Sequence, residues 1–390
     1  MRTQVGIIGA GPAGLVLAHL LARQGIESIV VENRSREYVE ARIRAGILEQ
    51  ETAEMLVDTG VGERLQREGI RHDGIYLQWP GTRHHLDFPA LCGRSVWVYG
   101  QTEVVKDLIT ERLGAGLPLY FEVSDTSVRD IDSNRPSIGF TDASGAAQTI
   151  ACDVIVGADG FHGVSRPAIP DALRTTWQRD YPFSWLGILA DVPPSTDDLI
   201  YAWHPNGFAL HSMRSQKLSR LYLQVDPDEN LDDWSDDRIW SELATRFEID
   251  GWTLNEGPVL EKLLAPMRSF VSTPMRHGQL FLAGDAAHIV PATGAKGLNL
   301  AVADVRLLAK ALTAYYDNGS TALLDAYPET ALRNVWRKTH FSWWMTTMMH
   351  VHGDEFDQQL QLSQLRYVAT SEAAARSLAE NYTGLPLDEL

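Results

Sequence analysis

Cysteine, metal-binding motifs and long apolar runs are all scarce in this sequence. Its 390 residues include two cysteines, Cys92 and Cys152, which are too few for a disulfide framework. The sequence contains neither a CxxC nor an HExxH motif, so we expect no metal site. No apolar run reaches the ~18–20 residues needed to span a bilayer. We therefore expect a cytoplasmic protein without a membrane span.

Positive charge is also in deficit. Lys and Arg together number 34 against 51 Asp and Glu, which gives a net charge of −17. A nucleic-acid partner would require a basic surface that neutralises phosphates, so we expect none. An anionic substrate would need a cation placed locally, because the overall field of the protein repels it.

The order of the expected elements indicates an α/β protein, α+β overall. A strand at residues 4–8, a helix at 12–23 ended by Gly25 and a strand at 28–32 form a β-α-β unit. Two further apolar segments, 153–156 and 280–283, each run into a glycine and an acid. We expect them to complete the same sheet.

The middle of the chain has a different pattern. Short alternating segments, separated by Pro, Asn, Asp and Ser turns, predict an antiparallel sheet near residues 186–191, 199–203, 208–213 and 221–225. We therefore expect a nucleotide-binding domain in residues 1–180 and an inserted, mostly antiparallel substrate-binding sheet domain in residues 181–270. Residues 271–390 would complete the first domain and form a helical C-terminal part.

A dinucleotide-binding turn follows the first strand. Gly9, Gly11 and Gly14 form a GxGxxG motif between a strand and a helix, as in Rossmann-like folds. The free N–H groups of the helix N-terminus suit a pyrophosphate. Glu32 ends the next strand, where a carboxylate accepts hydrogen bonds from a ribose hydroxyl. The motif alone does not distinguish FAD from NAD.

Two later segments favour FAD. DVIVGADG at 153–160 includes Asp159, and LFLAGDAAHIVPATGAKGLN at 280–299 includes Asp285. Asp285 ends a strand, where a carboxylate can hold ribityl hydroxyls. The small-residue loop at 291–297 would let backbone N–H groups approach a flat ring, and it leads into a helix N-terminus that favours a reduced, anionic flavin.

These segments resemble the fingerprints of the group A flavoprotein aromatic monooxygenases, and the likeness extends over nearly the whole chain. The shared stretches are ARIRAG at 41–46, VYGQTEV at 98–104, GFHGVSR at 160–166, YPFSWLG at 181–187, FSWWMT at 341–346 and ENYTGLP at 380–386. The resemblance implies an FAD-dependent enzyme that uses O2 and NAD(P)H to hydroxylate 4-hydroxybenzoate to 3,4-dihydroxybenzoate. It also implies a homodimer, with residues 341–349 in the core or at the dimer contact.

The substrate clamp is expected on two strands. Ser212 and Arg214 lie two residues apart on a predicted strand and so share a face, and Tyr222 lies on the next strand. An arginine fork with hydroxyl donors suits a planar carboxylate. The resemblance implies the same role for these three residues.

The resemblance also assigns the remaining site residues. It implies a proton path from the substrate phenol through Tyr201 and Tyr382 to His72 at the solvent end, where histidine suits a proton exchange near neutral pH. The implied apolar walls are Trp185, Leu199 and Leu210. The implied flavin contacts are Arg42, Arg44, Gln101, Arg220, Lys296, Gly297, Leu298 and Asn299.

The chain departs from the family pattern at two places. Ala292 stands where the family loop usually carries a second proline, which predicts a less rigid loop and a looser grip on the substrate. The second departure concerns the pyridine nucleotide, which has no Rossmann site of its own. The residues expected to bind it are Asn33, Arg34, Tyr38, His162, Arg166 and Arg268, and we expect use of both nucleotides with a lean to NADPH.

Alternative functions remain open at this point. A related hydroxylase acting on 3-hydroxybenzoate or 4-aminobenzoate would share the fold, although the tyrosine pair and the clamp favour a para-hydroxy acid. A flavin dehydrogenase or reductase that inserts no oxygen would not need the proton path. A non-catalytic flavin sensor would show no turnover.

Overall fold

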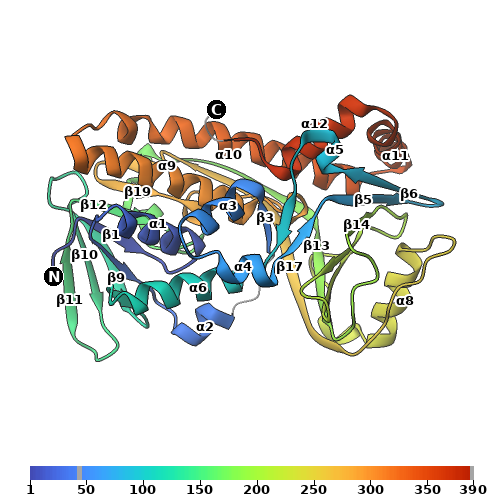
Figure 1. Ribbon diagram of the computed structural model, residues 1–390, viewed down its shortest axis with the longest axis horizontal. Coiled ribbons are helices and arrows are strands. Elements are labelled where there is room, and N and C mark those ends of the chain that lie inside the picture. The colour runs from blue at the N-terminus through green and yellow to red at the C-terminus, as the bar shows by residue number, and fades with distance from the viewer. Residues whose placement is uncertain (42–45, 387–390) are drawn as a thin grey trace.

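The computed structural model describes residues 1–41 and 46–386, which form two sheet-based parts joined by long helices (Figure 1). The first part holds a six-stranded sheet in the order β18-β19-β12-β1-β2-β8. The bounds are β1 Val5–Ile8, β2 Ser28–Val31, β8 Leu119–Tyr120, β12 Val154–Gly157, β18 Arg276–His277 and β19 Leu280–Leu282. Because β1 pairs in parallel with β2 and β12, and β12 with β19, the prediction of one sheet from distant segments is confirmed.

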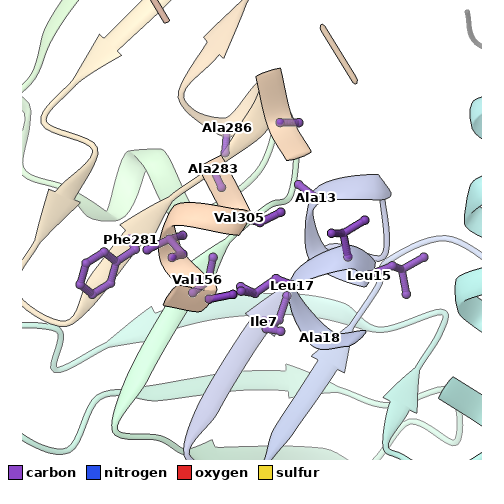
Figure 2. Close-up of a cluster of buried hydrophobic side chains, with 14 of the residues drawn as sticks. Ile7, Ala13, Leu15, Leu17, Ala18, Val156, Phe281, Ala283, Ala286 and Val305 are labelled. Carbon is purple, nitrogen blue, oxygen red and sulfur yellow. The ribbon is translucent and has the colours of Figure 1, made fainter. Parts of the chain in front are cut away.

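Two helices cover one face of this sheet. α1 (Pro12–Arg23) begins with proline at its first position and is followed by Gly25 in the left-handed region, so both of its ends agree with the sequence prediction. α9 (Gly297–Asn318) packs beside α1, and Figure 2 shows Leu17 and Val305 from the two helices in one buried cluster above the sheet. This packing fixes the N-termini of both helices.

The second part is an eight-stranded sheet in the order β20-β17-β13-β16-β15-β14-β5-β6. Its bounds are β5 Gly74–Trp79, β6 Thr82–Asp87, β13 Thr175–Ala190, β14 Leu199–Ala202, β15 Ala209–Met213, β16 Ser219–Val225, β17 Val259–Thr273 and β20 His288–Ile289. Only the pair β14 and β5 is parallel within this sheet, so the expected, mostly antiparallel character is confirmed.

The strands of this sheet differ in length from the prediction. β13 has 16 residues and pairs with the 15-residue β17, whereas the sequence suggested a short strand at 186–191. The segment around Pro182 reads as a turn, but the register shift between Asp180 and Ser184 accommodates it inside the strand. The strands β5 and β6 come from the N-terminal third of the chain, where we expected only the nucleotide-binding domain.

Smaller elements complete the molecule. Two three-stranded sheets contain β9 Ser124–Arg129, β10 Ser137–Thr141 and β11 Ala147–Ala151, and β3 Ile47–Glu49, β4 Ile70–His72 and β7 Val96–Val98. The other helices are α2 Arg36–Ala41, α3 Gln50–Asp58, α4 Glu63–Glu68, α5 Phe88–Cys92, α6 Gln101–Gly114, α7 Ser165–Ala168, α8 Asp236–Arg246, α10 Ala322–Met349, α11 Glu355–Thr370 and α12 Glu372–Thr383. The predicted helical C-terminal part is confirmed.

The long helix α10 runs along both parts in Figure 1. Phe341, Met345, Met348 and Met349 near its C-terminal end are buried in the core beside the second sheet, which satisfies the core alternative for residues 341–349. None of the helices within residues 1–41 and 46–386 combines the length and apolar character that crossing a bilayer requires.

Candidate active site

The glycine-rich turn leaves an open cradle in front of α1. A Cβ on Gly9 would lie 2.3 Å from the carbonyl oxygen of Ala158, and one on Gly14 would lie 2.0 Å from that of Gly9. A Cβ on Gly11 would meet nothing within 4 Å. Gly9 and Gly14 are thus required by packing, whereas Gly11 faces free space at a helix N-terminus, where a pyrophosphate fits.

The three predicted acids have different surroundings. Glu32 accepts hydrogen bonds from the backbone N–H groups of Ala10, at 2.7 Å, and Arg34, at 2.9 Å, so its carboxylate is held beside the cradle. Asp159 accepts from Ser165 and thereby fastens the loop at the start of α7, and burial raises its pKa. Asp285 is exposed in the turn after β19. Glu32 lies beside the cradle, and the buried Oδ1 of Asp159 has no hydrogen-bond partner among the described residues.

The loop before α9 is a second open cradle. It forms a short turn at Ala292–Gly294, Ala295 has φ of 53°, and α9 begins at Gly297. A Cβ on Gly297 would meet nothing within 4 Å, and no side chain caps the N-terminus of α9. A helix N-terminus with free space in front of it fits the negative charge of a reduced flavin. Leu298 is half-buried there.

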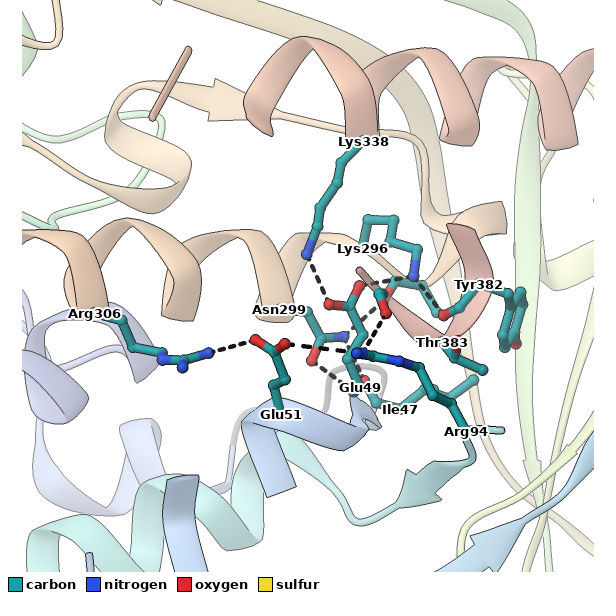
Figure 3. A network of polar contacts seen from close by, with 12 residues as sticks. Ile47, Glu49, Glu51, Arg94, Lys296, Asn299, Arg306, Lys338, Tyr382 and Thr383 are labelled. Atoms are coloured by element: carbon teal, nitrogen blue, oxygen red, sulfur yellow. Dashed lines mark hydrogen bonds and ion pairs between the residues drawn. The ribbon is translucent and has the colours of Figure 1, made fainter. Parts of the chain in front are cut away.

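Two residues expected to contact the flavin instead fasten this loop (Figure 3). Lys296 is buried and donates to Glu49, at 2.8 Å, and to the backbone carbonyl of Tyr382, at 2.6 Å. Burial alone would raise the pKa of Glu49, but Lys296 and Lys338 outweigh it and lower that pKa to about 2. Burial lowers the pKa of Lys296 to about 8.

Asn299 makes a similar connection. Its side chain accepts from the backbone of Glu49 and donates to the carbonyl oxygens of Ile47 and Ala295. The flavin loop is therefore bonded to β3 on one side and to the end of α12 on the other. Gln101 is the first residue of α6. Arg42 and Arg44 lie outside the described residues.

A cavity lies between this loop and the second sheet. The structure brings together there all the residues predicted for the substrate clamp and walls. Its lining comprises Gly46, Ile47, Val98, Trp185, Leu199, Tyr201, Leu210, Ser212, Met213, Arg214, Arg220, Tyr222, Ala292 and Ala295. Because Ala292 and Ala295 belong to the flavin loop, the cavity faces the second cradle.

Strand register explains how the cavity residues line up. Tyr201, Leu210 and Tyr222 are directly opposite one another on β14, β15 and β16. Ser212 and Arg220 form the next pair on the same face of the sheet, two residues further along the strands. At the rise of about 3.3 Å per residue, the two rows lie about 7 Å apart. This spacing suits a single aromatic ring with one polar group at each end.

Two guanidinium groups reach the cavity. Arg214 donates to Thr102 at 3.1 Å, and a Cβ on Gly100 would lie 2.2 Å from its Nη1, so only glycine leaves room for it. Arg220 is buried, donates to Tyr222 at 3.3 Å, and has an Nη1 atom without a hydrogen-bond partner in the described chain. Neither arginine forms an ion pair within the described residues, so the cavity offers positive charge to an anion.

Two buried tyrosines form the next group. The hydroxyls of Tyr201 and Tyr382 lie 2.8 Å apart, and burial raises the pKa of both. Both phenols therefore stay neutral and can pass a proton by exchanging hydrogen bonds. The resemblance implied that His72 reaches solvent, but the structure differs, because His72 on β4 is completely buried among the strands.

Sequence reasoning missed several residues behind the cavity walls. The indole N–H of Trp185 donates to His350 at 2.6 Å, and His350 contacts the backbone carbonyl of Thr346 at 3.0 Å. Thr346 in turn donates to Thr293 in the flavin loop. His350 lies 165 positions from Trp185, and no local pattern pointed to this pair. Thr102 and Gly100, by contrast, fall within a shared stretch.

The residues expected to bind the pyridine nucleotide form two groups. Asn33, Arg34 and Tyr38 are exposed around the start of α2, and the Arg34 guanidinium lies 5.2 Å from the centre of the Tyr38 ring. The second group centres on Phe161, whose ring contacts His162, Arg166 and Arg268. Within the described residues no contact joins the two groups.

The comparison with known proteins gives the class of protein. The chain matches the family model described as FAD binding domain over residues 2–342, and it therefore belongs to that family. It is 48% identical over 392 residues to p-hydroxybenzoate hydroxylase of Acinetobacter baylyi, with 100% of this chain and 96% of the relative covered. The chain is thus an FAD-dependent aromatic hydroxylase, a flavoprotein monooxygenase.

More distant proteins share the fold. The probable NADH-specific resorcinol 4-hydroxylase of Rhodococcus jostii is 26% identical over 358 residues, which cover 83% of this chain and 61% of that protein. The solved structure of p-nitrophenol 4-monooxygenase from Pseudomonas putida DLL-E4 has a TM-score of 0.83 at 20% identity and covers 99% of both chains. The two open helix N-termini are consistent with FAD, and the predicted fold class is confirmed.

Proposed function

We propose that this hydroxylase acts on 4-hydroxybenzoate and forms 3,4-dihydroxybenzoate with O2 and NAD(P)H. The observation that carries the proposal is the cavity, which combines two arginines that form no ion pair within the described residues, aromatic walls and the hydroxyl pair of Tyr201 and Tyr382. The relative from Acinetobacter baylyi, named p-hydroxybenzoate hydroxylase, supports the same substrate.

In this proposal, the substrate carboxylate binds Ser212 and Arg214, with Tyr222 donating to the same group. A charge-assisted hydrogen bond from arginine contributes more than a neutral one, and the guanidinium fork fixes the plane of the ring. The ring would lie between Trp185, Leu199 and Leu210, which exclude water from the reacting carbon.

The para-hydroxyl of the substrate then reaches the hydroxyl of Tyr201. Because the phenolate is more electron-rich than the phenol, removing the proton through Tyr201 and Tyr382 prepares the ring for oxygen transfer. When bound, FAD supplies the activation of O2 for insertion into the ring. The open N-termini of α1 and α9, with Glu32 and Asp285, would hold it.

The electron donor is proposed from two groups of residues. Arg34 is the cation beside the exposed Tyr38 ring, where it can pair with a 2′-phosphate, while Glu37 opposes one. His162, Arg166 and Arg268 would hold the pyrophosphate. We propose that both nucleotides reduce the flavin, with NADPH preferred mildly. A preference for NADH of about a hundredfold in kcat/KM would overturn this preference.

The test of the main proposal is a product assay with labelled oxygen. Purified holoenzyme should consume NADPH when 4-hydroxybenzoate is added and should form 3,4-dihydroxybenzoate that carries one ¹⁸O atom from ¹⁸O2. The panel includes 3-hydroxybenzoate and 4-aminobenzoate. Product without the label would indicate a dehydrogenase. NADPH oxidation that yields only hydrogen peroxide with 4-hydroxybenzoate would reject the substrate.

We further propose a cytoplasmic homodimer. Phe356, Leu360 and Tyr367 are exposed and fall on one face of α11 at helical spacing, which leaves an apolar stripe without a partner in the described chain. Both cysteines are free thiols, as a reducing compartment requires. Light scattering should give twice the chain mass, and the Phe356→Ser change should shift the protein toward the monomer.

A further inference from the structure

His72 cannot exchange a proton with solvent unaided, because its side chain is 0% exposed. Its Nδ1 lies 3.1 Å from Oδ1 of Asp198, an ion-pair distance, although the direction of the N–H does not meet hydrogen-bond geometry. Its Nε2 has no hydrogen-bond partner among the described residues. A buried imidazole with a free nitrogen needs a neighbour that connects it to water.

Asp198 provides such a connection. Its second oxygen, Oδ2, lies 2.8 Å from Nε2 of His85, whose side chain is 35% exposed. One carboxylate therefore bridges a buried histidine and a surface histidine. The three side chains come from β4, from the segment just before β14 and from β6, and β14 also carries Tyr201.

The position of His85 is fixed by close packing. A Cβ on Gly74 would lie 2.4 Å from Nε2 of His85, so the ring sits where only glycine leaves space. The Tyr76 ring on the neighbouring strand lies 4.7 Å from the His85 ring, centre to centre. In this position its Nε2 atom is directed at Asp198.

We propose that Asp198 and His85 extend the proton path, with His85 as the group that exchanges the substrate proton with solvent. The extension rests on the proposed function, since the proton comes from the bound phenol. The O–H bond of the phenol breaks, His72 gains a proton on one nitrogen and loses one from the other through Asp198, and His85 delivers one to a buffer molecule. One proton leaves the phenol and one reaches the buffer, so no further reactant is needed; each histidine ends as its other tautomer and is reset when a proton passes back along the path to the product.

The electrostatic surroundings favour this direction of transfer. Burial would raise the pKa of Asp198, but its contacts with His72 and His85 outweigh burial and lower it, so the carboxylate stays charged and attracts a proton to either ring. The charge of Asp198 also raises the pKa of Tyr382, after burial and Tyr201, which places the carboxylate within electrostatic reach of the tyrosine pair. The other titratable groups that face His85 are Tyr76 and His84.

The experiment follows proton release when 4-hydroxybenzoate binds to the holoenzyme, by stopped flow with a pH-indicator dye. The His85→Ala change should slow release by at least about tenfold and leave the equilibrium affinity within about twofold. Imidazole in the buffer should restore the rate, since His85 is partly exposed. The matched control is His84→Ala on the same strand, which forms neither a hydrogen bond nor an ion pair with Asp198 within the described residues and should release protons at the normal rate.

A second variant tests the bridge itself. Asp198→Asn keeps both histidines and should slow release as much as His85→Ala, without rescue by imidazole. Normal release in either variant, or a slow His85→Ala rate that imidazole does not change, would overturn the extended path. If the unmodified holoenzyme binds the substrate without any proton release and forms no hydroxylated product, the proposed function has failed instead.

Discussion

The buried ion-pair network around Glu49 gives the sharpest prediction about stability. Glu49 is 6% exposed and pairs at 2.8 Å with both Lys296 and Lys338 (Figure 3). The Glu49→Gln change leaves two ammonium groups with no carboxylate in a buried site. Removing one partner of a buried pair costs about 3–5 kcal/mol in the free energy of unfolding. We expect that loss near neutral pH.

The stability deficit of the Glu49→Gln variant should shrink both at low pH and as the pH rises toward 8. The folded pKa of Glu49, about 2, lies below its ordinary value of 4.5, so the unmodified protein loses this stabilisation as the pH falls from 4.5 toward 2. The folded pKa of Lys296 is about 8, below its ordinary 10.5, and it falls further in the variant. The variant therefore releases that proton earlier, and its deficit shrinks as the pH rises toward 8.

Urea unfolding of the holoenzyme across this pH range measures the effect, with Glu51→Gln as the matched control. Glu51 lies two residues away, its side chain is 23% exposed, and it pairs with Arg306 at 2.9 Å. A partly exposed pair contributes at most about 1 kcal/mol, so the control should lose little. Equal losses in the two variants, or a Glu49→Gln deficit that is constant with pH, would refute the reasoning.

Three further predictions concern the cavity. The first is Ala292→Pro, which introduces a proline after Pro291, whose ψ of 143° is a conformation favoured before proline. The change should stabilise the protein by about 0.4–1 kcal/mol in thermal unfolding and tighten substrate binding. Unchanged substrate affinity and turnover would show that Ala292 does not loosen the loop. His350→Leu leaves the indole N–H of Trp185 unpaired, which should cost about 1–3 kcal/mol in urea unfolding and raise KM, with partial recovery in His350→Gln. Arg214→Lys removes the guanidinium fork and should weaken 4-hydroxybenzoate binding by about 1.5–3 kcal/mol in a flavin absorbance titration; an unchanged Kd would exclude a carboxylate at that position.

Local sequence signals predicted the nucleotide-binding core well. The glycines of the first turn, the proline that begins α1 and Gly25 after it each act within a few residues, so the sequence defines them. The pairing of β14 with β5 was not predicted, because it joins segments more than a hundred positions apart and the two strands carry no shared motif. The long strand β13 was missed because a bulge hides Pro182 inside it.

In the site, too, local sequence patterns predict some side-chain positions, whereas contacts between distant segments are not predicted. Ser212 and Tyr222 lie on one face of neighbouring strands, as their alternation in the sequence predicts, whereas Arg214 lies one residue beyond the end of β15. Lys296 falls within a recognisable cofactor loop, yet its charge is directed at Glu49, which lies 247 positions away. The motif therefore predicts a cofactor loop, but it carries no signal for the distant partner that holds the loop in place.

The charge of the whole chain and the charge of the cavity act in opposite directions. A protein with a net charge of −17 repels an anionic substrate, and salt screens that repulsion at distances beyond about 10 Å. Inside the cavity the balance reverses, because Arg214 and Arg220 form no ion pair among the residues that the structure describes, although Glu103 and Glu261 act on Arg214 at longer range. A buried cation without an ion-pair partner, such as Arg220, destabilises the empty protein, and the carboxylate of the proposed substrate would relieve that cost. The same interaction with the arginines would then provide both the affinity for the substrate and the selection for an acid. An aromatic alcohol of the same shape should therefore bind weakly.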